Sequence, residues 1–216
     1  MYKEILEEIN LYAETNFASW LRPFLSINMN SSEKVIGVRV PTLRKMAKKY
    51  ATIDELDLLK LLQSNIHEHR ALAIFIMLLK SKKDPKMIAD LYLKNLEYIN
   101  NWDLIDYSAP HIIAPHVNVE VLHQLADSDY MWANRVAMVS TIYFIKKDNY
   151  DLALDFAEKF ISHKHHLMHK ASGWMLREIG KRNEEVLKDF LMKHSSEMPA
   201  IMRSYATEKL RKRDCP

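Results

Sequence analysis

Glycine, proline and cysteine are scarce in this chain of 216 residues, which has three glycines, seven prolines and one cysteine. All-β sandwiches and nucleotide-binding α/β sheets need many turn residues, so the scarcity of glycine and proline argues against both. Walker loops, dinucleotide fingerprints and nucleophile elbows depend on glycine and do not occur in the sequence, so we expect no nucleotide cofactor. The chain is therefore predicted to be helical.

The single cysteine, Cys215, lies next to the end of the sequence. No intrachain disulfide, thiolate metal cluster or buried cysteine nucleophile is predicted, which fits a reducing cytoplasm. The first twenty residues lack the basic-then-apolar order of a secretory signal, and no apolar run approaches the roughly 20 residues that span a bilayer. We therefore expect a cytoplasmic protein without a membrane partner.

Positive charge is modest overall but uneven along the chain. The net charge of +3 is too small to demand a polyanionic partner. Two segments nevertheless carry five basic residues against one acidic residue each, Ser162–Arg182 and Arg203–Arg213. Basic surfaces of this kind bind phosphates, although a solvated helix face is the alternative for both segments.

Apolar residues recur at helical spacing through most of the chain, as in the run Ala71, Ile74, Phe75, Leu78 and Leu79. Strand-like alternation is not sustained anywhere. Turn-forming residues interrupt the helical pattern at residues 28–34, 82–86, 115–118, 146–149 and 195–199. The pattern predicts a succession of short helices.

A weak internal repeat aligns helices on a basic residue that is followed closely by alanine. The markers Arg70, Arg135, Lys170 and Arg203 are separated by 65, 35 and 33 residues, and a further unit around Ser108 falls inside the first interval. A period in the mid-thirties is typical of arrays of helix pairs. We predict one all-α, HEAT-like solenoid domain over residues 1–216, with the markers lining a concave basic groove that holds a DNA duplex or a partner peptide.

Histidines form two clusters whose metal-binding potential differs. His67 and His69 lie two residues apart around Glu68 and would point in different directions on a helix, so they cannot share an ion. His165 and His169 lie four residues apart, in a group with His163 and His166. A metal site there lacks a third ligand at a sensible spacing, so a surface or phosphate-facing role is favoured and no metal is predicted.

Three aromatic and charged motifs follow one another along the chain. Trp102 and Asp106 are four residues apart and share one face of a helix. A Trp-Ala-Asn-Arg segment then ends at Arg135, and Gly173 opens the segment Gly-Trp-Met-Leu-Arg-Glu. In this order the motifs resemble the AlkD-like DNA alkylation repair glycosylases. The similarity extends from about Val35, through a Gly-x-x-x-Pro-x-x-Arg turn at residues 37–44, to about Arg203.

The resemblance implies an enzyme that removes alkylated bases from duplex DNA, without a cofactor and as a monomer. It assigns the catalytic carboxylate to Asp106, the flanking aromatic walls to Trp102 and Trp174, and a backbone-gripping cation to Arg135. The family has a further aromatic contact ahead of the glycine turn, for which this sequence has no clear match. Phe24 would fill that place only if the loop after it carries an insertion.

The implied reaction suits these residue types. Alkylation at N7 of guanine or N3 of adenine makes the base a cationic leaving group, so the enzyme needs to stabilise only the positive charge that develops on deoxyribose. A nearby carboxylate does so and orients water, and indole faces add cation–π attraction. Many base-excising enzymes flip their target, but the resemblance implies a grip on the backbone of a base that stays in the duplex.

Basic residues outside these motifs are candidates for phosphate contacts: Arg44, Lys45, Lys48, Lys49, Lys164, Lys170, Arg177, Lys181, Arg203 and Arg211. Two other functions remain open at this point. A basic solenoid could bind branched or distorted DNA without excision. It could also be a scaffold for a protein partner, in which the tryptophans pack and the aspartates cap helices.

Overall fold

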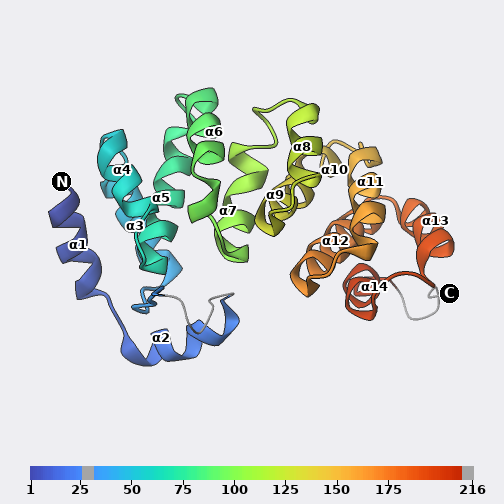
Figure 1. Ribbon diagram of the computed structural model, residues 1–216, viewed down its shortest axis with the longest axis horizontal. Helices are drawn as coiled ribbons and strands as arrows, with labels where there is room; N and C mark the ends of the chain where they lie inside the picture. Colours follow the sequence, from blue (N-terminus) through green and yellow to red (C-terminus); the bar gives the residue numbers. More distant parts are fainter. Residues whose placement is uncertain (26–31, 211–216) are drawn as a thin grey trace. The chain divides into compact units, whose positions relative to one another are not determined.

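The computed structural model describes residues 1–25 and 32–210, and these residues form helices joined by short loops (Figure 1). Within them the β pairing is a single parallel bridge between Lys34 and Ile66. The predicted all-α class is confirmed. The chain separates into two compact units, Met1–Ser108 and Ala109–Pro216, and the boundary falls inside α7 (Trp102–Ile112). The single domain over residues 1–216 remains a prediction.

The first unit is built around helix α5. Its elements are α1 (Tyr2–Leu11), α2 (Thr15–Leu21), η1 (Arg22–Phe24), α3 (Val40–Lys49), α4 (Glu55–Leu62), α5 (His67–Lys80), α6 (Pro85–Lys94), η2 (Leu96–Tyr98) and the first part of α7. Helix α5 packs against α3, α4 and α6. Every residue of α5 from His67 to Met77 is buried, so this helix forms the centre of the unit.

Side chains cap the helices that surround α5. Asp54 accepts a hydrogen bond from the Asp57 amide at 2.8 Å and so caps the start of α4. Asp84 accepts one from the Met87 amide at 3.3 Å, and Pro85 follows it as the first residue of α6. Both caps satisfy amide groups that have no partner inside the helix, which fixes where each helix begins.

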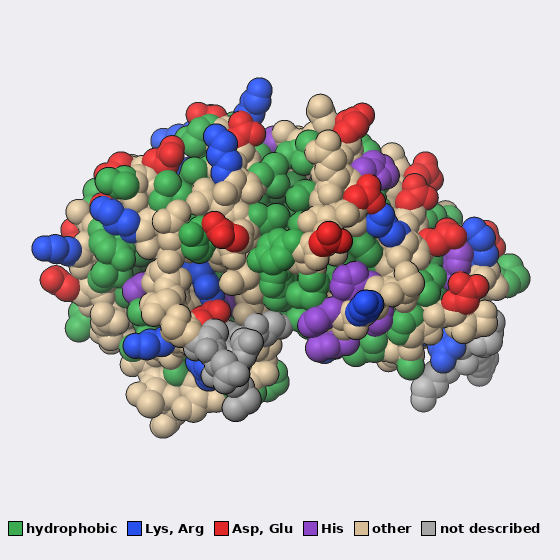
Figure 2. Space-filling view, in the orientation of Figure 1, with side chains coloured by type: hydrophobic (Ala, Val, Ile, Leu, Met, Phe, Trp, Pro, Cys, Tyr) green, Lys and Arg blue, Asp and Glu red, His purple; other side chains and the backbone are tan. Residues whose placement is uncertain are grey.

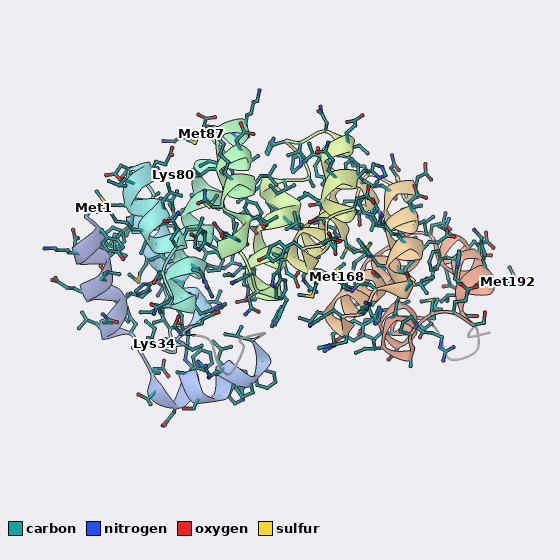
Figure 3. The ribbon with its side chains drawn as sticks, viewed as in Figure 1. Met1, Lys34, Lys80, Met87, Met168 and Met192 are labelled. Carbon is teal, nitrogen blue, oxygen red and sulfur yellow. The ribbon has the colours of Figure 1, made fainter. Side chains whose placement is uncertain are left out.

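The second unit has two central helices. Its elements are the end of α7, α8 (Val119–Ala126), α9 (Met131–Ser140), α10 (Ile142–Ile145), α11 (Asp151–Lys159), η3 (Phe160–Ser162), α12 (His166–Gly180), α13 (Glu184–His194) and α14 (Ala200–Thr207). Helix α9 packs against α8, α11 and α12, and α12 also contacts α13 and α14. Met168 of α12 is fully buried, whereas Met192 of α13 points into solvent (Figure 3).

Glycine is required where the chain approaches α2 and where α12 meets α14. Gly37 has a φ of 82°, and a Cβ there would lie 2.2 Å from the Glu14 carbonyl oxygen. A Cβ on Gly173 would lie 2.4 Å from the Met202 carbonyl oxygen. Gly37 therefore permits the turn before α3, and Gly173 permits the close contact between α12 and α14.

The repeat markers fall at matching places in their helices but differ in exposure. Arg70 and Arg203 are the fourth residues of α5 and α14, and Arg135 and Lys170 are the fifth residues of α9 and α12. Arg70 and Arg135 are each only 4% exposed, so these two do not have the exposure that lining an open groove requires. The further unit around Ser108 differs in its place, because Ser108 is the seventh residue of α7 and not the fourth or fifth.

None of the described helices combines the length and the apolar character needed to cross a membrane.

Candidate active site

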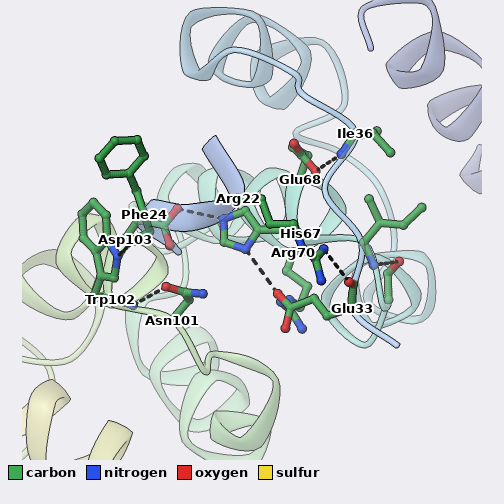
Figure 4. Close-up of polar contacts among 12 residues, drawn as sticks. Arg22, Phe24, Glu33, Ile36, His67, Glu68, Arg70, Asn101, Trp102 and Asp103 are labelled. Carbon is green, nitrogen blue, oxygen red and sulfur yellow. Dashed lines mark hydrogen bonds and ion pairs between the residues drawn. The ribbon is translucent and has the colours of Figure 1, made fainter. Parts of the chain in front are cut away.

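Helix α7 presents Trp102 and Asp106 one turn apart in the first unit. The helix begins at Trp102, whose amide donates to the side-chain oxygen of the buried Asn101 at 3.0 Å. The indole Nε1–H of Trp102 donates to the carbonyl oxygen of Phe24 in η1 at 2.8 Å (Figure 4). Trp102 and Asp106 are both half-buried, so each keeps part of its surface open to a ligand.

Tyr107, which follows Asp106 on α7, is influenced by two carboxylates and a guanidinium. Burial raises the pKa of Tyr107, the charges of Asp103 and Asp106 raise it further, and Arg44 opposes them. The Arg44 guanidinium carbon lies 5.4 Å from the centre of the Tyr107 ring and 4.9 Å from that of Phe75, within cation–π range. Arg44 thus lies over Tyr107, the residue next to Asp106. The position of Arg44 in the sequence did not indicate this contact.

Arg135 and Trp174 lie in the second unit, on α9 and α12. Arg135 is buried, and its guanidinium donates to the Leu167 carbonyl oxygen at 2.7 Å, which ties α9 to the first turn of α12. Trp174 is half-buried, and its Nε1–H donates to the Glu178 carboxylate at 3.2 Å. Leu167 and Trp174 are seven residues apart on α12 and so share one face of it. Arg135 therefore supports the first turn of the helix that carries Trp174.

Some of the candidate phosphate-binding residues form ion pairs with carboxylates of the protein, and others are exposed. Arg44, Lys45 and Lys48 are exposed on α3, and Lys164 is exposed before α12. Arg177 instead pairs with Glu208, and the Lys181 ammonium lies 2.6 Å from the Glu178 carboxylate. Both pairings would have to yield before these two side chains could contact a phosphate.

The remaining candidates vary in the same way. The exposed Arg203 donates to the Ser195 carbonyl oxygen at 3.1 Å, and Lys170 is half-buried. The exposed Lys49 is paired with the Glu8 carboxylate at 2.5 Å. Arg211 lies outside the described residues. On the face shown in Figure 2, basic side chains are interspersed with acidic ones instead of forming one continuous positive surface.

The histidines before α12 organise the start of that helix. The His163 Nδ1 accepts from the His165 amide at 3.0 Å, and the His165 Nδ1 accepts from the Leu167 amide at 3.2 Å. Burial lowers the pKa of both rings, and neighbouring histidines lower it further. Among residues 1–25 and 32–210, no three His, Cys, Asp or Glu side chains are grouped so as to hold a metal ion.

Sequence reasoning missed a buried polar network at the start of α5. His67, Glu68, His69 and Arg70 are all buried, and each has its own contacts. The His67 Nε2 lies 2.9 Å from the Asp103 carboxylate of α7, whereas the His69 Nδ1 lies 3.0 Å from the Ser64 hydroxyl. The two rings therefore face different partners.

The rest of this network fixes the loop before α3. The Glu68 carboxylate accepts hydrogen bonds from the Ile36 amide at 3.0 Å and from the Gly37 amide at 2.7 Å. Arg70 is paired with the Glu33 carboxylate (Figure 4). The signal in the sequence was a run of four ionisable residues that directly precedes the apolar stretch beginning at Ala71. Such a run at the start of a buried helix indicates partners elsewhere in the chain, but it does not identify them.

A family model described as DNA alkylation repair enzyme matches residues 12–210. A solved structure described as a predicted DNA alkylation repair enzyme from Enterococcus faecalis is similar in fold, with a TM-score of 0.69 and 16% sequence identity. That similarity covers 93% of this chain and 97% of the other. No sequence among the curated proteins matches this chain.

Proposed function

This chain belongs to the DNA alkylation repair enzyme family, and from that premise we propose that it is a DNA glycosylase. The proposed reaction is hydrolysis of the N-glycosidic bond of cationic alkylated purines in duplex DNA, namely N7-alkylguanine and N3-alkyladenine. The proposed catalytic carboxylate is Asp106, and the proposed partner is DNA that carries such a base.

The observation that carries the proposal is the placement of Trp102 and Asp106 on α7. An indole and a carboxylate stand one helical turn apart, and both keep exposed surface. In α5, α9, α12 and α14, the fourth or fifth residue is basic, whereas the fifth residue of α7 is Asp106. The repeat thus replaces a cation with an anion at the position that the family resemblance assigns to catalysis.

The chemistry follows from the charge that develops as the glycosidic bond breaks. The alkylated base already carries a positive charge and leaves without being protonated, so the deoxyribose becomes the cationic centre. Asp106 would stabilise that centre and orient the attacking water, an electrostatic effect typically worth about 10² to 10³ in rate. The Trp102 face would add about 0.5 to 2 kcal/mol of cation–π attraction to the sugar.

Trp174 is proposed to supply a second aromatic face for the lesion's backbone, as the family resemblance implies. Arg135 is only 4% exposed and bonds to the Leu167 carbonyl oxygen. Its proposed contribution is accordingly to hold the first turn of α12, the helix that carries Trp174. The direct grip on the DNA backbone that the resemblance implies for Arg135 stays a prediction.

The proposal is tested by incubating the native protein with a duplex methylated at N7 of guanine and measuring the free N7-methylguanine released. Unmodified duplex serves as the control and should yield no free guanine. Absence of release together with salt-sensitive DNA binding would favour a non-catalytic DNA binder. Absence of both release and DNA binding would favour a scaffold for a protein partner.

A further inference from the structure

The buried network at the start of α5 reaches the candidate active site through Asp103. This residue lies between Trp102 and Asp106 in the sequence and belongs to the first turn of α7. Its carboxylate lies 2.9 Å from the His67 Nε2, and the other ring nitrogen, Nδ1, lies 3.6 Å from the Glu33 carboxylate. The His67 side chain is only 3% exposed. Water therefore has little access to the ring, and its partners are protein groups.

The charges of this network balance when His67 is protonated. The charged groups that face the ring are Asp103 from α7, Glu33 from the loop before α3, and Arg70 from the next turn of α5. Arg70 is itself paired with Glu33. Two carboxylates thus meet one guanidinium and one imidazolium. The imidazolium donates to Asp103 at 2.9 Å and faces Glu33 at 3.6 Å as an ion pair, whereas a neutral imidazole would bring no positive charge to either carboxylate.

The pKa of His67 agrees with this charge balance. Burial lowers the pKa, but the carboxylates of Asp103 and Glu33 outweigh burial and the opposing charge of Arg70, and the pKa is raised to about 9. The imidazolium is therefore the form of His67 present at neutral pH.

Backbone hydrogen bonds hold the loop that carries Glu33 against the start of α5. The Lys34 amide donates to the Asn65 carbonyl oxygen at 2.8 Å, and the His67 amide donates to the Lys34 carbonyl oxygen at 2.9 Å. Lys34, labelled in Figure 3, thus ties the loop that carries Glu33 to the start of α5. His67 then joins this fixed base to the first turn of α7.

We propose that Glu33, Arg70, His67 and Asp103 act as a positioning network that fixes the first turn of α7, and thereby the placement of Trp102 and Asp106 against the deoxyribose. This inference rests on the proposed glycosylase function. None of the four residues needs to touch DNA. They set the orientation of two side chains that do, and orientation errors of about 1 Å can cost about a hundredfold in rate.

The decisive comparison is between His67→Gln and the double variant His67→Gln with Asp103→Asn. The single variant leaves two half-buried carboxylates facing one guanidinium. The double variant restores neutrality and allows an amide-to-amide hydrogen bond. We expect His67→Gln to lower the single-turnover rate of N7-methylguanine release by about tenfold or more, with the Kd for duplex DNA within about twofold of native. The double variant should recover most of the rate.

The matched control is His194→Gln, which removes a buried histidine whose Nε2 lies 3.6 Å from the Glu158 carboxylate in the second unit. This variant should keep the native rate. A native rate in His67→Gln would overturn the proposal. A double variant no faster than His67→Gln would also overturn it, because the loss would then be unrelated to the charge balance with Asp103.

The pH dependence supplies a readout that a merely structural role would not produce. The ratio of the native rate to that of the double variant should decline above about pH 9, where His67 loses its proton. Ionisation of the substrate affects both proteins and cancels in this ratio. A ratio that stays constant across pH 7 to 10 would contradict the proposed role of the imidazolium.

A second readout does not require excision at all. The Trp102 indole N–H, which bonds to the Phe24 carbonyl oxygen, gives an NMR signal that Trp102→Phe identifies by its disappearance. The signal should shift in His67→Gln and return toward its native position in the double variant. If the native protein releases no base, the proposed function fails, and this signal still decides the positioning claim. An unshifted signal in His67→Gln would count against it.

Discussion

Trp102 has one structural contact and one proposed chemical role, and the two use different parts of its ring. Its Nε1–H is bonded to the Phe24 carbonyl oxygen at 2.8 Å, so the ring plane is anchored by the edge that carries nitrogen. The half-buried ring still keeps exposed surface. A hydrogen bond to an indole edge leaves the π face available, and that face is the part that attracts a cation.

Substitution of Trp102 should separate these two roles. Trp102→Phe keeps an aromatic face but loses the bond to Phe24, so it should lower the free energy of unfolding by about 1 kcal/mol. Trp102→Ala also removes the face, and a cation–π loss of about 0.5 to 2 kcal/mol corresponds to about a two- to thirtyfold lower single-turnover rate. Urea unfolding and single-turnover excision measure the two effects.

The buried Trp132 is the control. Trp132→Phe should lower the free energy of unfolding and leave the excision rate unchanged. A rate loss equal to that of Trp102→Ala would refute the assignment.

At the scale of elements, the helix breaks were predictable because they depend on local residues. The breaks expected at residues 82–86, 115–118, 146–149 and 195–199 coincide with the ends of α5, α7, α10 and α13. The break expected at residues 28–34 falls partly outside the described residues. Proline, asparagine and aspartate act through their own backbone and immediate neighbours, so the sequence reveals them directly.

The polar contacts between elements were not predictable in this way. The link from His67 to Asp103 spans 36 positions in the sequence, and the bond from Trp102 to Phe24 spans 78. Periodicity could place each of these residues on a helix or near a turn. It could not pair them, because pairing depends on how α5, α7 and η1 pack. The burial of Arg70 and Arg135 was missed for the same reason.

The link between α5 and α7 should make stability depend on pH. The pKa of His67 is raised to about 9 in the folded protein, against about 6.5 in an unfolded chain. Because the folded protein holds the His67 proton more tightly than the unfolded chain does, protonated His67 stabilises the fold. This stabilisation is fully present below about pH 6.5 and is lost as the pH rises through about 9. The native free energy of unfolding, compared with the His67→Gln, Asp103→Asn double variant, should therefore fall by about 3 kcal/mol over that range. Urea titrations at several pH values measure it, and a difference that grew with pH would have the wrong sign.

The contact between α12 and α14 should be sensitive to a single methyl group. A Cβ on Gly173 meets the Met202 carbonyl oxygen at 2.4 Å and the Tyr205 Cβ at 2.6 Å, so Gly173→Ala should destabilise the protein by about 1 to 3 kcal/mol. Gly180→Ala is the matched control, because its new Cβ meets chiefly the flexible end of Leu187. A helix-propensity gain of up to about 1 kcal/mol offsets that contact. Equal losses of unfolding free energy in Gly173→Ala and Gly180→Ala, measured by urea unfolding, would contradict this prediction. They would show that α14 can move away from α12 at little cost.

At the scale of the whole molecule, the family motifs carried more information than composition did. Composition and periodicity led to an all-helical chain, and the order of the motifs led to the family that matches residues 12–210. Net charge was less informative. Arg177 and Lys181, counted as free cations in the sequence, are paired with Glu208 and Glu178. Charge counts along a chain omit carboxylates that approach only after folding.

DNA binding should therefore depend on some cations more than on others. Replacing the exposed Lys45 and Lys48 by glutamine should reduce the slope of log Kd against log salt concentration by about 0.9 for each lost phosphate contact. Lys181→Gln should have a smaller effect, because Glu178 already pairs with Lys181. Fluorescence anisotropy with a labelled duplex over a range of salt concentrations measures the slopes.

Lys86→Gln, at an exposed position on α6, is the control and should keep the native slope. An unchanged slope in the Lys45, Lys48 variant would exclude these two residues of α3 from the DNA interface.

The central claim is that Asp106 stabilises the cationic sugar, and the most direct measurement is single-turnover release of N7-methylguanine by Asp106→Asn. This substitution keeps the size of the side chain and removes its charge. We expect the rate to fall at least about a hundredfold, while the Kd for duplex DNA stays close to native. Asp90→Asn, an exposed carboxylate on α6, should keep the native rate. Release by Asp106→Asn at a rate close to native would contradict the account.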